Sequence, residues 1–212
     1  IQFYNQKDIG FIMKLHKIAL YGCLLITSSL LMASCTSNQQ SSTKQSDVVD
    51  TNNDGWITDK DTRNEKAADF TILDANGKKV SLSDFKGKKV YINFWSSTCD
   101  MCYDESKDLE TFYRKHKNDK DIVFLSVGSL KDKRFNNQYS IDKINYEEAN
   151  SVLDDWGMTL PRYWDQNDSI LKAYEIRSMP THVFINSDGT LWFKFIGRMN
   201  IDALEDQYSQ LT

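Results

Sequence analysis

The sequence predicts an α/β domain over residues 67–212, because segments with strand character alternate there with segments of helical periodicity. Two local signals support this fold class. The pair Asn76-Gly77 lies between two short extended segments and is typical of a tight β-hairpin. Further along, Cys99 and Cys102 follow a strongly apolar segment, at a point where a strand is expected to give way to a helix. A domain of this size can bury a hydrophobic core of its own.

The first expected elements surround these two signals. Residues 70–73 and 79–82 are β-prone on either side of the Asn-Gly turn, and they predict an N-terminal β-hairpin. Residues 90–95 read Val-Tyr-Ile-Asn-Phe-Trp and predict a buried strand. Residues 102–116 carry apolar side chains at helical spacing, so a helix is expected directly behind the first cysteine.

The C-terminal half continues the alternation. Residues 122–127 predict a buried strand, and residues 146–156 and 169–174 have helical patterns. Two further strands, 182–186 and 191–196, are joined by a tight turn. The final helix is expected to begin after a capping asparagine, Asn200, and to place on its inner face Ile201, Leu204, Tyr208 and Leu211.

The front of the chain has the composition of an export signal. Residues 1–12 precede the first methionine, and we expect them to be an upstream extension of the reading frame. Residues 13–34 begin with a short basic segment and continue with roughly fifteen mostly apolar residues, the length of a signal-peptide core. The segment ends in Met-Ala-Ser before Cys35, which resembles the lipobox of bacterial lipoproteins. The resemblance implies lipidation of Cys35 and a membrane-anchored, extracytoplasmic domain; an uncleaved apolar anchor is the alternative.

Residues 35–66 predict a polar linker, because most of this segment offers little apolar surface to bury. Within it, the segment from Asp50 to Asp61 places oxygen-bearing residues, a glycine and a hydrophobic residue at the positions of a twelve-residue calcium loop. The last position is Asp rather than Glu, and no helical pattern precedes the segment. A solvated, turn-rich linker is therefore preferred over a calcium site.

Two thiols separated by two residues at the start of a helix predict thiol-disulfide exchange. The helix N-terminus presents free N–H groups and a positive dipole end, which stabilise a thiolate at Cys99. Cys102 lies within disulfide distance on the same turn. The 30 acidic and 26 basic residues give a net charge of −4, which argues against a nucleic-acid partner. His116 and His182 show no paired ligand spacing, so we predict no metal site and no cofactor.

The segment from Phe94 to Cys102, followed far downstream by Met179-Pro180-Thr181 ahead of a strand, resembles thioredoxin-like proteins. It most resembles the TlpA/ResA group of membrane-anchored thiol-disulfide oxidoreductases. This resemblance implies a thioredoxin-like fold with a central mixed β-sheet flanked by helices. It also implies an enzyme that reduces disulfides in exported proteins and is recharged by a membrane-embedded electron donor.

The resemblance assigns roles to individual residues. Cys99 attacks the partner disulfide, and Cys102 resolves the mixed disulfide that results. A cis Met179-Pro180 bond faces the dithiol and turns the backbone of Met179 toward an extended substrate segment. Trp95 is expected beside the dithiol in a steric role.

The proton acceptor for Cys102 is not evident from the sequence. Asn93 stands where cytoplasmic thioredoxins have a buried carboxylate, and an amide cannot carry a proton away. Water, Asp104 or Glu105 could take this role, but we expect both acids to lie on the exposed first turn of the helix. Asp100 is expected to disfavour the Cys99 thiolate by like-charge repulsion and so to favour a reducing couple.

Other classes of function remain open at this stage. A disulfide-forming oxidase has the same fold and differs in the direction of electron flow. A Cu(I)-binding module could use Cys99 and Cys102 as soft thiolate ligands. A purely structural disulfide is a poorer fit, because so short a loop contributes little closure entropy. A peroxiredoxin is nearly excluded, since Ile92 occupies the position where that class needs proline.

Overall fold

The computed structural model describes residues 51–52, 56–57, 62–140 and 142–212. The proposed upstream extension, the signal peptide and Cys35 lie outside these residues, as does most of the 50–61 segment that resembles a calcium loop. Within the latter, the described backbone forms two short antiparallel strands, β1 (Thr51–Asn52) and β2 (Trp56–Ile57). No helix within the described ranges is both long and apolar enough to cross a membrane.

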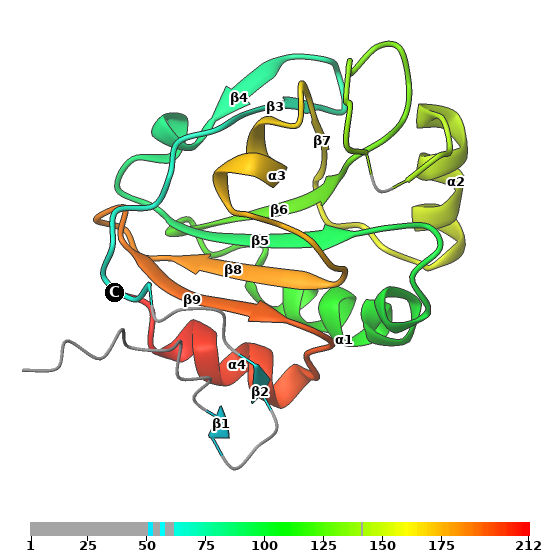
Figure 1. Cartoon of the computed structure of the whole chain (residues 1–212). Helices are drawn as coiled ribbons and strands as arrows, with labels where there is room; N and C mark the ends of the chain where they lie inside the picture. The colour runs from blue at the N-terminus through cyan, green and yellow to red at the C-terminus, as the bar shows by residue number, and fades with distance from the viewer. Residues whose placement is uncertain (1–50, 53–55, 58–61, 141) are drawn as a thin grey trace, which may run out of the picture. The chain divides into compact units, whose positions relative to one another are not determined.

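The remaining elements alternate between strand and helix, as predicted (Figure 1). In chain order they are β3 (Thr71–Asp74), β4 (Lys79–Ser81), the 3-10 helix η2 (Leu82–Phe85), β5 (Lys89–Trp95), α1 (Asp100–His116), β6 (Ile122–Gly128), α2 (Tyr146–Asp155), β7 (Arg162–Asp165), α3 (Ser169–Ala173), β8 (Thr181–Ile185), β9 (Leu191–Ile196) and α4 (Ile201–Ser209).

Strands β3 to β9 form one mixed sheet with the order β4-β3-β7-β6-β5-β8-β9. The pairs β5/β6 and β6/β7 are parallel, and the other neighbours are antiparallel. The predicted Asn-Gly hairpin is confirmed as β3 and β4 at one edge of the sheet. The mixed sheet with flanking helices is therefore the fold class that the sequence predicts.

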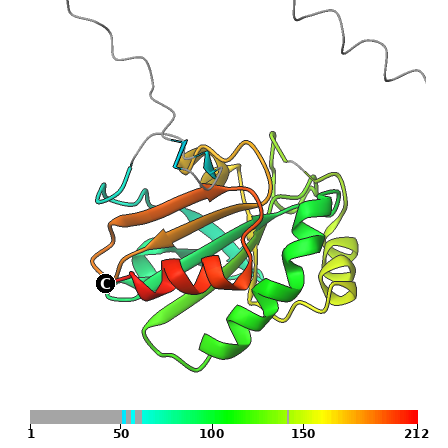
Figure 2. The ribbon, with the colours of Figure 1, turned by 90° about the horizontal axis from the view of Figure 1, so that it is seen from below.

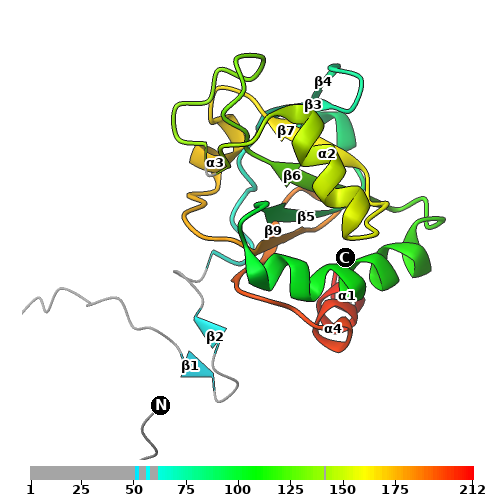
Figure 3. The ribbon, with the colours of Figure 1, turned by 90° about the vertical axis from the view of Figure 1, so that its right-hand side faces the viewer.

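Two hydrophobic cores lie on the two faces of the sheet. One core joins α1, α2 and α4 to the sheet through residues such as Leu109, Leu153 and Leu204. Figures 2 and 3 show α1 and α4 side by side on this face. The other core contains Ile170 and Leu171 of α3, with the 3-10 helix packed against it. The expected cap of the last helix is confirmed, since Asn200 accepts a hydrogen bond from the N–H of Ala203 at 2.9 Å.

Strand β7 is the strand of the seven-stranded sheet that the residue patterns do not predict. It has only four residues, follows Pro161, and contains the charged residues Arg162 and Asp165 at its ends. Its pairing decides its conformation, because it is antiparallel to β3 on one side and parallel to β6 on the other. A strand held between two neighbours needs little β-propensity of its own.

Gly128, the last residue of β6, lies against two tryptophan rings. A Cβ atom at this position would be 2.8 Å from Cζ3 of Trp164 and 3.1 Å from Cζ2 of Trp95. Both rings are almost fully buried and cannot move aside freely. We therefore expect Gly128→Ala to lower the free energy of unfolding by about 1–3 kcal/mol. Urea denaturation followed by tryptophan fluorescence measures this change, and an unchanged midpoint would show that the two tryptophan rings can move to make room for the methyl group.

Asp165, at the end of β7, is fully buried, and its Oδ2 has no hydrogen-bond partner among the described residues. Burial raises its pKa from 3.8 to about 6, although the backbone N–H of Ile170 donates to Oδ1. Between the unfolded and folded pKa values, the unfolded chain loses a proton that the folded protein retains. Stability therefore falls as pH rises from about 4 to about 6 and changes little above that.

We expect Asp165→Asn to remove this pH dependence. The difference in free energy of unfolding between this variant and the wild type should shift by about 2 kcal/mol in favour of the variant between pH 4.5 and pH 7. Urea denaturation of both proteins at the two pH values measures the shift. A difference that is the same at both values would contradict it.

The chain enters the domain at the edge strand β9. The N–H of Asn64 donates to the carbonyl of Leu191 at 2.8 Å, and the N–H of Ala67 donates to the carbonyl of Gly189 at 2.9 Å. Both acceptors belong to the region around the turn between β8 and β9. This turn lies at the end of β8 opposite to Pro180, which precedes the strand.

Candidate functional site

The dithiol lies at the junction of β5 and α1. Cys99 is the N-cap of α1, and its Sγ accepts a hydrogen bond from the backbone N–H of Cys102 at 3.1 Å. The two residues form a disulfide with their Cα atoms 5.2 Å apart. Cys99 is half-buried, whereas Cys102 is only 1% exposed. A partner sulfur therefore reaches Cys99 more readily, as expected for an attacking cysteine followed by a resolving one.

Pro180, Met179 and Trp95 lie at the same end of the sheet as the dithiol. The antiparallel register pairs Phe94 with Thr181, so the next pair along the two chains is Trp95 with Pro180. The Met179-Pro180 peptide bond is cis. Met179 is half-buried and, like Cys99, packs against the core cluster that contains Trp95 and Cys102. The structure thus brings together the five site residues that the sequence predicts within the described region.

Glu105 is not the exposed first-turn residue that the sequence predicts. It is fully buried, whereas its neighbour Asp104 is exposed. The Nδ2 of Asn93 donates to Oε1 of Glu105 at 3.2 Å, and the N–H of Met199 donates to Oε2 at 3.2 Å. The Nε2 of His182 lies 3.3 Å from the same Oε2. A buried carboxyl group therefore stands one helical turn after the resolving cysteine, on the same helix.

A pattern in the sequence could have indicated this position. Cys102, Glu105, Leu109 and Phe112 are spaced three or four residues apart, so they lie on one face of α1. Leu109 and Phe112 are buried in the core, and the face that they define also contains Glu105. The prediction of an exposed residue was wrong because the buried face of α1, and not the preference of acids for a helix N-terminus, decides where Glu105 lies.

Asp142 is a second buried acid that sequence reasoning does not find. It is 2% exposed, and its carboxylate accepts hydrogen bonds from both the backbone N–H and the Oγ of Ser97, at 2.5 and 2.7 Å. The backbone N–H of Asp142 donates a hydrogen bond to the carbonyl of Ser129, and its carbonyl accepts one from the N–H of Lys131. Asp142 therefore fastens the loop before Cys99 to the segment that follows β6. No local pattern relates two residues that are 45 positions apart.

Large, exposed apolar side chains lie next to the dithiol in sequence, on the first turn of α1. Met101 and Tyr103, in the first turn of α1, are 50% and 58% exposed. The ring of Tyr103 meets the edge of Trp156 with centroids 6.0 Å apart, and Trp156 in turn contacts Trp95 at 5.9 Å. An exposed apolar surface beside a reactive sulfur suits contact with a polypeptide better than contact with a small polar molecule.

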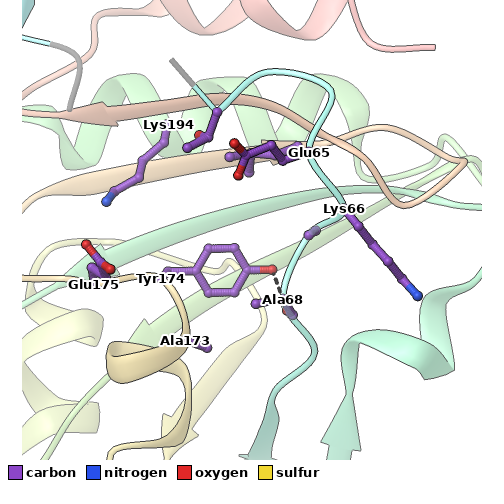
Figure 4. Close-up of a pocket in the computed structure, with 10 residues that line it drawn as sticks. Glu65, Lys66, Ala68, Ala173, Tyr174, Glu175 and Lys194 are labelled. Carbon is purple, nitrogen blue, oxygen red and sulfur yellow. Dashed lines mark hydrogen bonds between the residues drawn. The ribbon is translucent and has the colours of Figure 1, made fainter. Parts of the chain in front are cut away.

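A pocket elsewhere on the domain lies between residues 62–68, α3 and β9 (Figure 4). The hydroxyl of Tyr174 donates to the carbonyl of Ala68 at 2.8 Å within it. Its charged lining residues have both signs: Glu65, Lys66, Glu175 and Lys194. Neither cysteine of the dithiol lines this pocket, so it is separate from the redox site.

Comparison with known proteins agrees with the geometry. The Redoxin family matches residues 62–211. The thiol-disulfide oxidoreductase ResA of Bacillus thuringiensis (strain Al Hakam) is 27% identical over 164 residues, which cover 74% of this chain and 84% of that protein. The solved structure of the exposed lipoprotein thioredoxin Etrx1 of Streptococcus pneumoniae (strain TIGR4) is 28% identical to this chain and superimposes with a TM-score of 0.52. The match covers 68% of this chain and 100% of the solved one.

The thioredoxin domain of a thiol-disulfide oxidoreductase from Bacteroides vulgatus has a TM-score of 0.55 at 22% identity, over 70% of this chain and 96% of that domain. This similarity shows the thioredoxin-like fold. With a family match over most of the chain and a disulfide at the predicted dithiol, this chain belongs to the Redoxin family, as a thiol-disulfide oxidoreductase of the ResA type.

Proposed function

We propose that this chain is an extracytoplasmic, membrane-anchored enzyme that reduces disulfides in exported proteins. The observation that carries the proposal is the unequal burial of the two cysteines, with Cys99 accessible at the helix N-terminus and Cys102 enclosed behind it. The apolar side chains on the first turn of α1, Met101 and Tyr103, support a protein substrate. The names of the relatives agree with this class of reaction.

The reaction begins with the Cys99 thiolate. Its sulfur attacks one sulfur of the client disulfide, and the other client sulfur leaves as a thiolate that takes a proton from water. The backbone of Met179, turned by the cis bond to Pro180, offers an edge on which an extended client segment can pair. The mixed disulfide then holds the client covalently at Cys99.

In the second step, Cys102 releases the client from the mixed disulfide. Cys102 loses its proton to Glu105, its sulfur attacks the Sγ of Cys99, and the second client thiolate leaves. The client gains two electrons, and the enzyme retains a Cys99-Cys102 disulfide. A membrane-embedded electron donor, which we also propose, returns two electrons and restores the dithiol. We assign the role of proton acceptor to Glu105, because its carboxylate is buried one turn from Cys102, whereas Asp104 is exposed.

The reduction potential of the Cys99-Cys102 couple tests the direction of electron flow. The full chain, with Cys23 and Cys35 replaced by serine, is equilibrated with defined thiol-disulfide buffers and the two redox forms are separated by alkylation. A potential near or below about −230 mV supports the reductase, and a potential near −120 mV indicates the oxidase instead. If no intramolecular disulfide forms, the redox function is wrong, and Cu(I) binding by the two thiols becomes the alternative to measure.

Membrane anchoring through Cys35 is a separate part of the proposal. It is supported by the lipobox-like residues before Cys35 and by the similarity to Etrx1, which is itself named an exposed lipoprotein. We expect the mature protein to begin at Cys35 and to carry fatty acyl chains, which mass spectrometry of its N-terminal peptide detects. Cys35→Ser should remove the modification, and recovery of an unmodified residue 35 from the wild type would contradict it.

A further inference from the structure

His182 is a fully buried histidine on β8, beneath the dithiol end of the sheet. Its ring lies between the rings of Tyr91 and Phe195, nearly parallel to both, with interplanar angles of 20° and 24°. Its Nδ1 is 2.8 Å from the hydroxyl of Tyr91. Its Nε2 is 3.0 Å from the carbonyl of Gly197 and 3.3 Å from Oε2 of Glu105. Each ring nitrogen therefore has a defined polar partner.

These partners fix where the proton of the neutral imidazole lies. The carbonyl of Gly197 can only accept a hydrogen bond, so Nε2 of His182 carries the hydrogen. Nδ1 then accepts from the hydroxyl of Tyr91. Burial raises the pKa of Tyr91 well above its usual value, with a further contribution from Glu105, so this hydroxyl keeps its proton. His182 consequently directs an N–H group toward the carbonyl of Gly197 and the carboxyl group of Glu105.

Glu105 accepts two hydrogen bonds, and Nε2 of His182, already hydrogen-bonded to Gly197, lies 3.3 Å from its Oε2. Asn93 lies on β5, Met199 lies between β9 and α4, and His182 lies on β8. The polar groups around the two carboxyl oxygens are thus all N–H groups, which these oxygens can accept from.

We propose that His182 is a positioning residue which, through Glu105, sets the pH range over which Cys102 resolves the mixed disulfide. This inference rests on the proposed function, because it assigns a partner to the acid that takes the proton of Cys102. His182 does not touch the reacting sulfurs. It holds Oε2 of Glu105 in place and keeps the carboxylate form available as the proton acceptor.

The surroundings of His182 contain few other ionisable groups. Tyr91 faces it from β5, Glu105 faces it from α1, and β9 contributes the uncharged ring of Phe195. The nearby Arg198 is exposed and lies 3.6 Å from Asp108. Cys102 is on the same face of α1 as Glu105, one turn earlier. The pH response of the resolving step therefore depends on this small set of groups.

The two steps of the reaction can be observed separately with dithiobisnitrobenzoate, an aromatic disulfide that releases a coloured thiolate. Attack by Cys99 releases the first equivalent, and resolution by Cys102 releases the second. The reduced full chain is used with Cys23 and Cys35 replaced by serine, so that only the dithiol reacts. The rates of both phases are measured by stopped flow across a range of pH.

We expect His182→Phe to slow the second phase about tenfold at pH 7 and to move its pH midpoint up by about one unit, because Glu105 loses the N–H group that lies 3.3 Å from its Oε2. The first phase should be unchanged, since Cys99 is outside this network. His182→Gln retains an N–H donor and should recover part of the rate. His116→Phe is the matched control, because His116 pairs with Glu205 at 3.1 Å at the far end of α1.

A double-mutant cycle separates positioning from general damage to the fold. In a Glu105→Gln background, His182→Phe should change the second phase by less than about twofold, because the group through which it acts is already absent. Equal slowing in both backgrounds, or an unchanged pH midpoint in His182→Phe, would overturn the inference. If the wild type releases no second equivalent at all, the proposed redox function fails instead, so the two failures are distinguishable.

Discussion

Replacement of Cys102 by serine is expected to convert the protein into a covalent trap for its clients. Cys99 remains accessible and still attacks a client disulfide, but the mixed disulfide has no resolving thiol. Multiple-turnover reduction should fall by at least about a thousandfold. Non-reducing electrophoresis of the variant with a disulfide-bonded protein such as insulin should show a band that a reducing agent removes.

Cys99→Ser is the matched control for this experiment. Cys102 is 1% exposed, so it should capture no client when the outer sulfur is absent. The assignment of roles would be reversed if Cys99→Ser captured clients and Cys102→Ser did not. Capture by neither variant, together with normal folding, would contradict a mixed-disulfide mechanism.

Glu105→Gln is expected to have the second largest effect on catalysis. The amide retains an oxygen that can accept hydrogen bonds from its neighbours, so the fold should persist, but it cannot take the proton of Cys102. We expect the resolving step to slow about 100-fold near neutral pH and to recover as pH rises, because the Cys102 thiol must then lose its proton to solvent. Single-turnover decay of a preformed mixed disulfide at Cys99 measures this step directly.

Asp104→Asn provides the comparison, because Asp104 is in the same turn of α1 and is exposed. This variant should resolve the mixed disulfide at the wild-type rate. Equal effects of the two substitutions would indicate that the general negative charge near the helix N-terminus, rather than a buried proton acceptor, governs the step.

The fold was predictable wherever the determining signal is local. The Asn76-Gly77 turn, the cap at Asn200 and the apolar runs of β5 and β6 depend on neighbouring residues, and each appears where the sequence predicts it. β7 was missed because its conformation depends on pairing with β3 and β6, which are distant in sequence. Propensity carries no information about such partners.

The site divides in the same way. Cys99, Cys102 and Pro180 belong to short motifs, and motifs of this kind can be recognised in the sequence without knowledge of the fold. His182 and Asp142 act through residues that folding brings to them from far along the chain, Glu105 and Ser97, and no spacing rule connects these pairs. Glu105 is an intermediate case, since the helical periodicity of α1 places it on the same face as the buried residues Leu109 and Phe112.

The attachment of residues 64–67 beside the turn between β8 and β9 has a consequence for how an anchored domain would work. Pro180 and the dithiol lie at the other end of β8, whose five residues span about 17 Å. A domain held by a linker at this turn presents its reactive sulfur at the end of β8 away from the point of attachment. In the proposed anchored protein, clients in the surrounding solution would reach the sulfur directly, whereas the proposed electron donor in the membrane would reach it only after the domain rotates on its linker. Linker length and stiffness thereby become a control on recharging that is independent of the chemistry at the sulfurs.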